Sequence, residues 1–167
     1  MSLSLNSAEA TQALGKKLGE ILPAGTVILL QGDLGAGKTT LIQGLAKGLA
    51  IDEPVVSPTF TLINEYLEGK IPLYHLDLYR LDSADVETLY PEMYWEGIEV
   101  EPGITAIEWS ERLSYKPDTY LLIQLQNSDV GRNATIQLFG NESQEIGDRI
   151  QKIISSFPLI DTPLHSS

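Results

Sequence analysis

The pattern of apolar and polar positions divides the chain into alternating helical and extended segments. Apolar residues recur at helical spacing up to about residue 22, which predicts a first helix that Asn6 or Ser7 can cap. The apolar run at 26–31 predicts a buried strand, and residues 38–50 return to helical spacing. A strand followed at once by a helix is the opening of a parallel α/β sheet.

Further strands and a closing helix are predicted along the rest of the chain. The runs 61–67 and 71–80 flank Glu68-Gly69-Lys70, which predicts an antiparallel hairpin with a glycine turn. A short helix that Ser83 can cap is expected next, at 83–89. The remaining predicted elements are strands at 103–108, 119–126 and 134–139, an amphipathic helix at 143–156 and a frayed tail at 157–167.

This order of elements predicts an α/β fold with a mostly parallel central sheet, flanking helices and one antiparallel hairpin. A chain of 167 residues with 43% hydrophobic content is expected to form one domain, over residues 1–156. No apolar run reaches the length of a membrane span, and the start lacks the features of a signal peptide, so a cytoplasmic protein is expected. The sequence has no cysteine, which excludes disulfides, cysteine-ligated zinc and thiol catalysis.

The net charge of −12 is concentrated in the middle of the chain. Residues 51–111 hold 14 acidic and two basic side chains, whereas the segments before and after carry net charges of +1 and −1. Proteins that bind tRNA directly usually have a basic stripe, because phosphate contacts supply most of the affinity. Any nucleic-acid role is therefore expected to run through a partner.

Within the acidic third, residues 82–101 contain seven acids and no basic side chain, interleaved with Leu, Tyr, Met and Trp. Two interpretations stay open. The segment is either a solvated acidic face over a core stripe or a docking surface for a basic partner.

The candidate chemistry centres on a glycine-rich loop at residues 32–40, which fits the pattern GxxxxGK[ST] between a predicted strand and a predicted helix. Glycines let backbone N–H groups surround a phosphate, and the following helix adds the positive end of its dipole. The lysine can reach the β and γ phosphates, and the first threonine can bind Mg²⁺. The predicted ligand-binding residues of the loop are Gly32, Asp33, Leu34, Gly35, Ala36, Gly37, Lys38, Thr39 and Thr40.

This pattern predicts a P-loop NTPase with ATP and Mg²⁺ as ligands. A dinucleotide site is disfavoured, because no third glycine completes that fingerprint. GTP is disfavoured as well, because the nearest candidate for a guanine-reading sequence, at residues 115–118, has Tyr115 where an asparagine is needed.

Two acids stand at or near the ends of predicted strands, where α/β proteins place catalytic groups. Both are candidates for binding Mg²⁺ opposite Thr39, and for positioning the attacking water Glu108 is the first choice and Asp77 the second. His75 is interpreted as a structural histidine. The loop at 51–61 is either a sensor of the γ-phosphate or a plain connection with local hydrogen bonds.

Four blocks of sequence carry a resemblance to one family: GDLGAGKTT at 32–40, SPTFTL at 57–62, YHLDLYR at 74–80 and EWSER at 108–112. In this order and spacing they resemble the bacterial TsaE family, formerly called YjeE, over about residues 7–140. The resemblance implies an ATPase that supports a transferase complex. In that complex, TsaB and TsaD partners attach a threonylcarbamoyl group to adenosine 37 of ANN-decoding tRNAs, so tRNA is an indirect partner.

The resemblance also implies roles for single residues. Members commonly carry a Leu-Gly pair after the short acidic helix, whereas this chain has Leu89-Tyr90 there. Residues 57–61 are implied to form a switch-like loop. The other implied roles are Thr39 and Glu108 on Mg²⁺, Asp77 as a further metal-binding or water-orienting acid, Ser7 and Ala8 near the adenosine, and Trp109 and Glu111 near the nucleotide.

Hydrolysis with Lys38 as the charge-stabilising group is the leading hypothesis. It is expected to be slow, because no arginine finger is evident; Arg80, Arg112 and Arg132 are internal candidates, and a partner is another source. A nucleotide-gated binding module is the alternative. A small-molecule kinase is disfavoured, because residues 81–111 offer no Arg or Lys for a lid over the acceptor.

Overall fold

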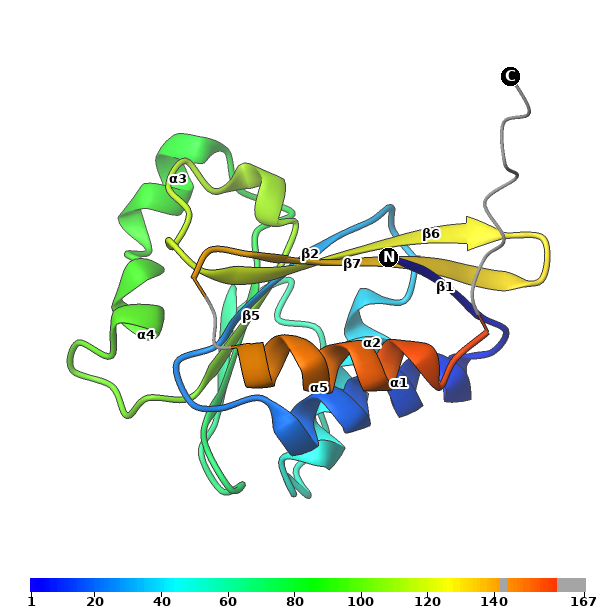
Figure 1. Cartoon of the computed structure of the whole chain (residues 1–167). Helices are drawn as coiled ribbons and strands as arrows, with labels where there is room; N and C mark the ends of the chain where they lie inside the picture. Colours follow the sequence, from blue (N-terminus) through cyan, green and yellow to red (C-terminus); the bar gives the residue numbers. More distant parts are fainter. Residues whose placement is uncertain (142–143, 159–167) are drawn as a thin grey trace.

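A seven-stranded sheet runs through the protein, whose computed structural model describes residues 1–141 and 144–158 (Figure 1). The strand order is β1-β7-β6-β2-β5-β4-β3. Four neighbouring central strands are parallel: β6 (Tyr120–Ser128), β2 (Val27–Gln31), β5 (Ile104–Glu108) and β4 (Leu73–Asp77). Three strands at the two edges pair antiparallel: β3 (Ile63–Tyr66), β7 (Gly131–Phe139) and β1 (Ser2–Leu5). The predicted parallel centre and the β3–β4 hairpin are confirmed.

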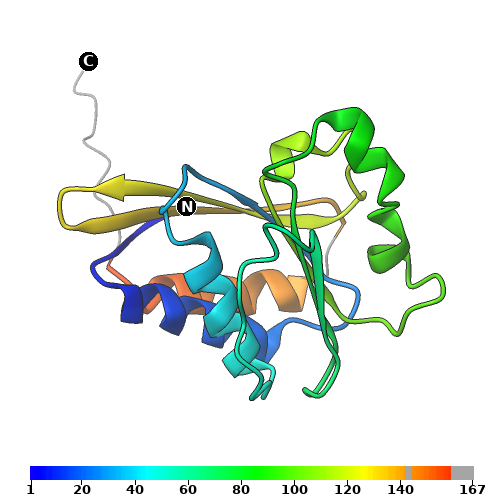
Figure 2. The same ribbon diagram turned by 180° about the vertical axis from the view of Figure 1, so that it is seen from behind.

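Helices cover the two faces of the sheet unequally. On one face lie α1 (Ala8–Ile21), α2 (Lys38–Gly48) and α5 (Gln144–Ser155), side by side in Figures 1 and 2. The other face carries α3 (Ser83–Thr88) and α4 (Glu92–Glu96) at the β5–β4 end. Two buried hydrophobic clusters fill these two layers. No helix in the described part of the chain is long and apolar enough to cross a membrane.

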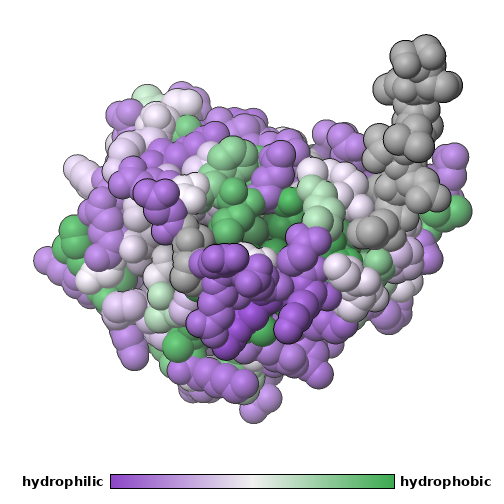
Figure 3. Space-filling view, in the orientation of Figure 1, coloured by the Kyte–Doolittle hydropathy of each residue, from purple (hydrophilic) through white to green (hydrophobic). Residues whose placement is uncertain are grey.

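The closing helix α5 is amphipathic, as predicted. Ile150, Ile153 and Ile154 are buried against the sheet and α1. Hydrophilic side chains gather over this helix on the opposite side, at the front of the molecule in Figure 3. Residue 143, where the helix was expected to begin, lies outside the described residues.

The helices α1 and α2 pack closely against each other through glycines. A Cβ atom at Gly44 would overlap the backbone carbonyl of Gln12, and one at Gly48 would overlap that of Lys16. Gly15 of α1 meets the backbone of α2 in the same way. Because α2 begins at Lys38, this contact holds the helix that follows the glycine-rich loop.

Several local predictions need correction. Strand β1 was not predicted, although its alternating pattern buries Leu3 and Leu5 against the core. The cap of α3 is Asp82, not Ser83, because the Asp82 carboxylate accepts a hydrogen bond from the Asp85 N–H at 2.8 Å. Ser7 caps α1 as expected, accepting from the Ala10 N–H at 3.1 Å.

Of the predicted tail, the first two residues are described. Phe157 packs against the core, and the carbonyl of Pro158 accepts a hydrogen bond from the Ser4 N–H at 2.7 Å. Residues 159–167 lie outside the described residues, and the extent of a frayed tail stays a prediction.

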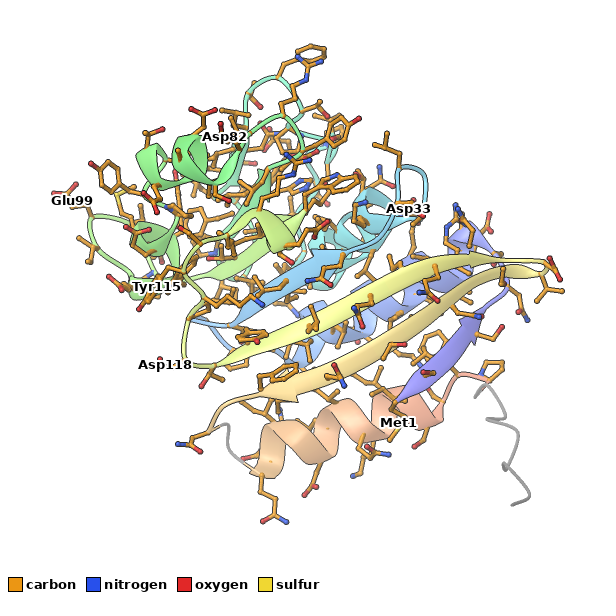
Figure 4. All side chains as sticks on the ribbon, turned by 90° about the horizontal axis from the view of Figure 1, so that it is seen from above. Met1, Asp33, Asp82, Glu99, Tyr115 and Asp118 are labelled. Atoms are coloured by element: carbon orange, nitrogen blue, oxygen red, sulfur yellow. The ribbon has the colours of Figure 1, made fainter. Side chains whose placement is uncertain are left out.

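The aromatic residues of the acidic segment 82–101 belong mainly to the second core. Tyr94 is buried, its ring lies 5.0 Å from that of Tyr74 in a tilted arrangement, and its hydroxyl donates a hydrogen bond to Glu65 at 3.3 Å. Asp82 and Glu99, two acids of the segment, are exposed (Figure 4). The core-stripe interpretation is therefore correct for these side chains, and the docking surface stays a prediction.

Tyr90 has a φ of 49°, in the left-handed region that favours glycine. The resemblance described above implies a glycine at this position, and the tyrosine of this chain has a backbone conformation that glycine adopts readily.

Candidate functional site

The glycine-rich loop forms one wall of a cavity of about 330 Å³ at the carboxyl ends of the parallel strands. Gly35 and Gly37 have φ values of 77° and 103°, a turn that brings the N-terminus of α2 toward the cavity. Among the described residues, the lining consists of residues 34–40 of the loop with Ser57, Thr59, Asp77, Tyr79, Glu108, Trp109 and Arg132.

The ammonium group of Lys38 is folded back onto its own loop. It donates hydrogen bonds to the carbonyls of Gly32 and Asp33, the latter at 3.1 Å, and lies 4.3 Å from the centre of the Trp109 ring. Burial lowers the pKa of Lys38 from its ordinary value, and four nearby carboxylates oppose that shift: Glu108, Glu111, Asp77 and Asp33. The central electrostatic feature of the site is therefore a buried ammonium group enclosed by the glycine-rich loop.

Glu108 ends strand β5 and is almost fully buried, with 3% of its surface exposed. The Thr39 hydroxyl lies 3.2 Å from both of its carboxylate oxygens. His75 Nε2, from the neighbouring strand β4, lies 2.6 Å from Oε2. The structure therefore brings together Thr39 and Glu108, two residues predicted to act on one metal.

Asp77 ends strand β4 directly opposite Glu108 in the β4–β5 register. Its Oδ1 accepts a hydrogen bond from the Tyr79 N–H at 3.0 Å, and its Oδ2 accepts one from the Ser57 hydroxyl at 3.1 Å. Both predicted acids thus stand at strand ends and line the same cavity. Parallel neighbouring strands are what place them side by side.

The donors around the cavity suit a hard cation. No ready-made group of three His, Cys, Asp or Glu side chains is present in the described residues. Mg²⁺ is commonly bound by one or two carboxylates and completes its shell with other oxygen ligands, mainly water and phosphate. The Thr39 hydroxyl and the carboxylates of Glu108 and Asp77 fit that requirement.

The loop at 57–61 reaches the site through its hydroxyl groups. The Ser57 hydroxyl lies 2.9 Å from that of Thr59 while it donates to Asp77, and both hydroxyl residues line the cavity. Phe60 is 82% exposed, with the Arg80 guanidinium 4.2 Å from its ring centre. The loop is a connection that contacts a site acid, and its predicted switching stays a prediction.

Arg132 is the candidate arginine that lines the cavity. Its Nη2 donates to the Gly35 carbonyl at 3.0 Å, and its chain packs against Gly37. The other two candidates point elsewhere: Arg112 donates to the Leu81 carbonyl at 2.7 Å, and Arg80 lies over Phe60. No local sequence motif connects strand β7 with the loop, so the sequence left Arg132 as one of three candidates.

Several predicted ligand residues do not line the cavity. Gly32 and Asp33 offer their carbonyls to Lys38, and Glu111 acts on Lys38 by charge. Ser7 caps α1, with Ala8 as its first residue. Trp109 does line the cavity; it has a left-handed backbone, with φ of 57°, and its ring lies 4.9 Å from that of Tyr79.

A parallel sheet with a GxxxxGK[ST] loop after one strand, and acids at the ends of two strands beside it, defines a P-loop NTPase fold. Within that class the chain belongs to the TsaE family. The family's sequence model, "Threonylcarbamoyl adenosine biosynthesis protein TsaE", matches residues 5–134, so the predicted family is confirmed.

Individual relatives agree. A "tRNA threonylcarbamoyladenosine biosynthesis protein TsaE" of Nostoc sp. (strain PCC 7120) is 65% identical over 136 residues, which cover 81% of this chain and 84% of the relative. The protein of the same description from Bacillus subtilis (strain 168) is 36% identical over 146 residues, covering 86% and 89%. The crystal structure of Bacillus subtilis YdiB matches with a TM-score of 0.72 at 32% identity, covering 91% of this chain and 93% of that one.

Proposed function

We propose that the protein hydrolyses ATP to ADP and phosphate with Mg²⁺, and that hydrolysis supports turnover of the threonylcarbamoyl transferase complex that modifies adenosine 37 of ANN-decoding tRNAs. The main support for this proposal is that one cavity at the N-terminus of α2 is lined by Lys38, Thr39, Asp77 and Glu108. TsaB-type and TsaD-type proteins of the cytoplasm are the proposed partners. A net charge of −12 favours contact with tRNA through them.

The proposed mechanism assigns one task to each group. Loop N–H groups and Lys38 stabilise the charge that spreads over the transferred phosphoryl group. Thr39 and Glu108 would hold Mg²⁺, which supplies charge neutralisation when it is bound. Asp77 orients the attacking water, because its carboxylate is fixed by hydrogen bonds from Ser57 and from the Tyr79 N–H.

Turnover measurements test this proposal. Purified protein is assayed for phosphate release from ATP and from GTP, alone and with TsaB-type and TsaD-type partners. We expect slow ATP turnover alone, acceleration by the partners and weaker competition by GTP. Fast turnover that ignores the partners would refute the link to the transferase complex.

A nucleotide-gated binding module is the second candidate function. It is favoured by the Ser57–Asp77 hydrogen bond, which connects the site to a loop carrying the exposed Phe60. A binding module of this kind requires the protein's affinity for its partner to differ between the ADP-bound form and the form bound to a non-hydrolysable ATP analogue. Equal affinities would refute this function.

Replacing Glu108 by glutamine and Asp77 by asparagine should separate their roles. Glu108→Gln is expected to weaken Mg²⁺-dependent nucleotide affinity about tenfold, a change of about 1.4 kcal/mol, because a charged ligand becomes neutral. Asp77→Asn is expected to keep that affinity and to lower turnover about tenfold to a hundredfold, because the water loses its orientation. Calorimetry with and without Mg²⁺, beside single-turnover assays, measures both, and exchanged phenotypes would reverse the two assignments.

Arg132→Met is expected to lower nucleotide affinity about tenfold or more. The Arg132 guanidinium donates a hydrogen bond to the carbonyl of Gly35, which has a left-handed backbone conformation, and so holds the loop in place. A hydrogen bond from a charged group is worth about 1.5–3 kcal/mol, which corresponds to about tenfold or more in affinity. Arg149→Met is the matched control, since Arg149 makes an exposed ion pair with Glu145 on α5. Calorimetric titration with ATP compares them, and equal affinities would show that Arg132 does not order the loop.

A further inference from the structure

His75 occupies a position in which a histidine is costly. It lies in the middle of β4 with 0% of its surface exposed, between the buried Tyr74 and Leu76. Its Nδ1 has no hydrogen-bond partner within the described residues. A buried polar atom without a partner costs free energy that an apolar side chain of similar size would not.

Within the part of the chain that the structure describes, the polar contact of the ring is with Glu108, at 2.6 Å from Nε2 to Oε2. An ionised carboxylate only accepts hydrogen bonds, so the ring donates through Nε2. Because Nδ1 has no partner among the described residues, the proton that reaches Glu108 is the one on Nε2. Such short bonds to a charged acceptor are among the stronger hydrogen bonds in proteins.

Strand register explains why His75 Nε2 reaches the carboxylate of Glu108. In the β4–β5 pair, His75 lies opposite Ala106 and Asp77 lies opposite Glu108. Residues two apart on a strand point to the same face, so His75 is diagonal to Glu108 on the face that carries both acids. The carboxylate thus receives His75 on Oε2 from within the sheet and the Thr39 hydroxyl from the cavity side.

We propose that His75 is a positioning residue that fixes the rotation of the Glu108 carboxylate. With Oε2 held by the ring, the plane of the carboxylate is set, and Oε1 is kept toward Thr39 and the cavity. The inference rests on the proposed function, in which Thr39 and Glu108 would hold Mg²⁺. Partners that orient a metal-binding carboxylate commonly matter about 10-fold to 100-fold for metal affinity or activity.

Two substitutions at residue 75 separate positioning from packing. His75→Gln keeps an N–H donor near the Nε2 position, whereas His75→Leu fills similar volume without a donor. Binding of a non-hydrolysable ATP analogue is measured by calorimetry with Mg²⁺ and with EDTA, beside thermal unfolding of each variant. We expect all three proteins to bind alike in EDTA. With Mg²⁺, His75→Leu is expected to bind about 10-fold more weakly, the loss expected for Glu108→Gln, and His75→Gln to stay close to the parent.

The outcomes are distinguishable. A folded His75→Leu variant with the Mg²⁺-dependent affinity of the parent would overturn the role of His75 alone, as would equal losses in both variants. A parent protein without Mg²⁺-dependent binding would overturn the proposed function and this role with it.

A spectroscopic test does not depend on the folding of residue-75 variants. The sequence has two histidines, His75 and His165, so a His165→Ala protein labelled with ¹⁵N-histidine reports His75 alone. We expect a protonated Nε2, with its signal shifted by Glu108→Gln. An unprotonated Nε2, or no response to Glu108→Gln, would overturn the proposal.

Discussion

Replacing Lys38 by methionine is expected to lower ATP turnover about a thousandfold. The loss of one preorganised donor to the charge of the transition state typically costs 10²–10³-fold, and Lys38 brings a full charge to a buried position. In the structure this charge is held by the carbonyls of Gly32 and Asp33 and by the face of Trp109. Phosphate oxygens would compensate the same ammonium better than neutral carbonyls, because they carry charge.

The matched control for this substitution is Lys47→Met on the same helix. Lys47 is exposed and donates to the Gln12 side chain at 2.9 Å, away from the cavity. Phosphate release under single-turnover conditions compares the two variants with the parent. Turnover of the Lys38 variant within tenfold of the parent would refute the assignment of the glycine-rich loop as the site of phosphoryl transfer.

The part of the site that could be predicted from sequence is the part encoded locally. The glycine-rich loop is recognisable because its strand, turn and helix follow one another along the chain. Asp77 and Glu108 could be predicted because each ends an apolar strand, and parallel neighbours bring their ends together. His75 was interpreted as a structural histidine; its contact with Glu108 depends on the register between two strands, which periodicity does not reveal.

The parts that could not be predicted depend on distant pairing. Arg132 reaches the loop because β7 pairs with β6, which in turn pairs with β2. Strand β1 was missed because four residues give a weak period-2 signal, and its stability comes from pairing with β7. The cap of α3 was misassigned because Asp82 and Ser83 are both good caps one residue apart, and backbone geometry decides between them.

Gly44→Ala is expected to destabilise the fold by about 1–3 kcal/mol, the usual range for overpacking. The added Cβ would meet the carbonyl and Cα of Gln12, which are backbone atoms, so α1 must move away from α2. The higher helix propensity of alanine, worth up to about 1 kcal/mol, offsets only part of this cost. For a chain of this size the melting temperature should fall by roughly 2–4 °C per kcal/mol.

Gly147→Ala makes the same chemical change on α5 and should have the opposite sign. A Cβ atom at Gly147 would meet no atom within 4 Å among the described residues, so the gain in helix propensity is not offset by overlap. The melting temperature of this variant is expected to rise slightly while that of Gly44→Ala falls, as measured by thermal unfolding followed by circular dichroism. Equal shifts would mean that propensity alone decides, and that α1 and α2 can separate without cost. Opposite shifts would identify glycine packing, rather than helix propensity, as the interaction that holds α2 in place behind Lys38.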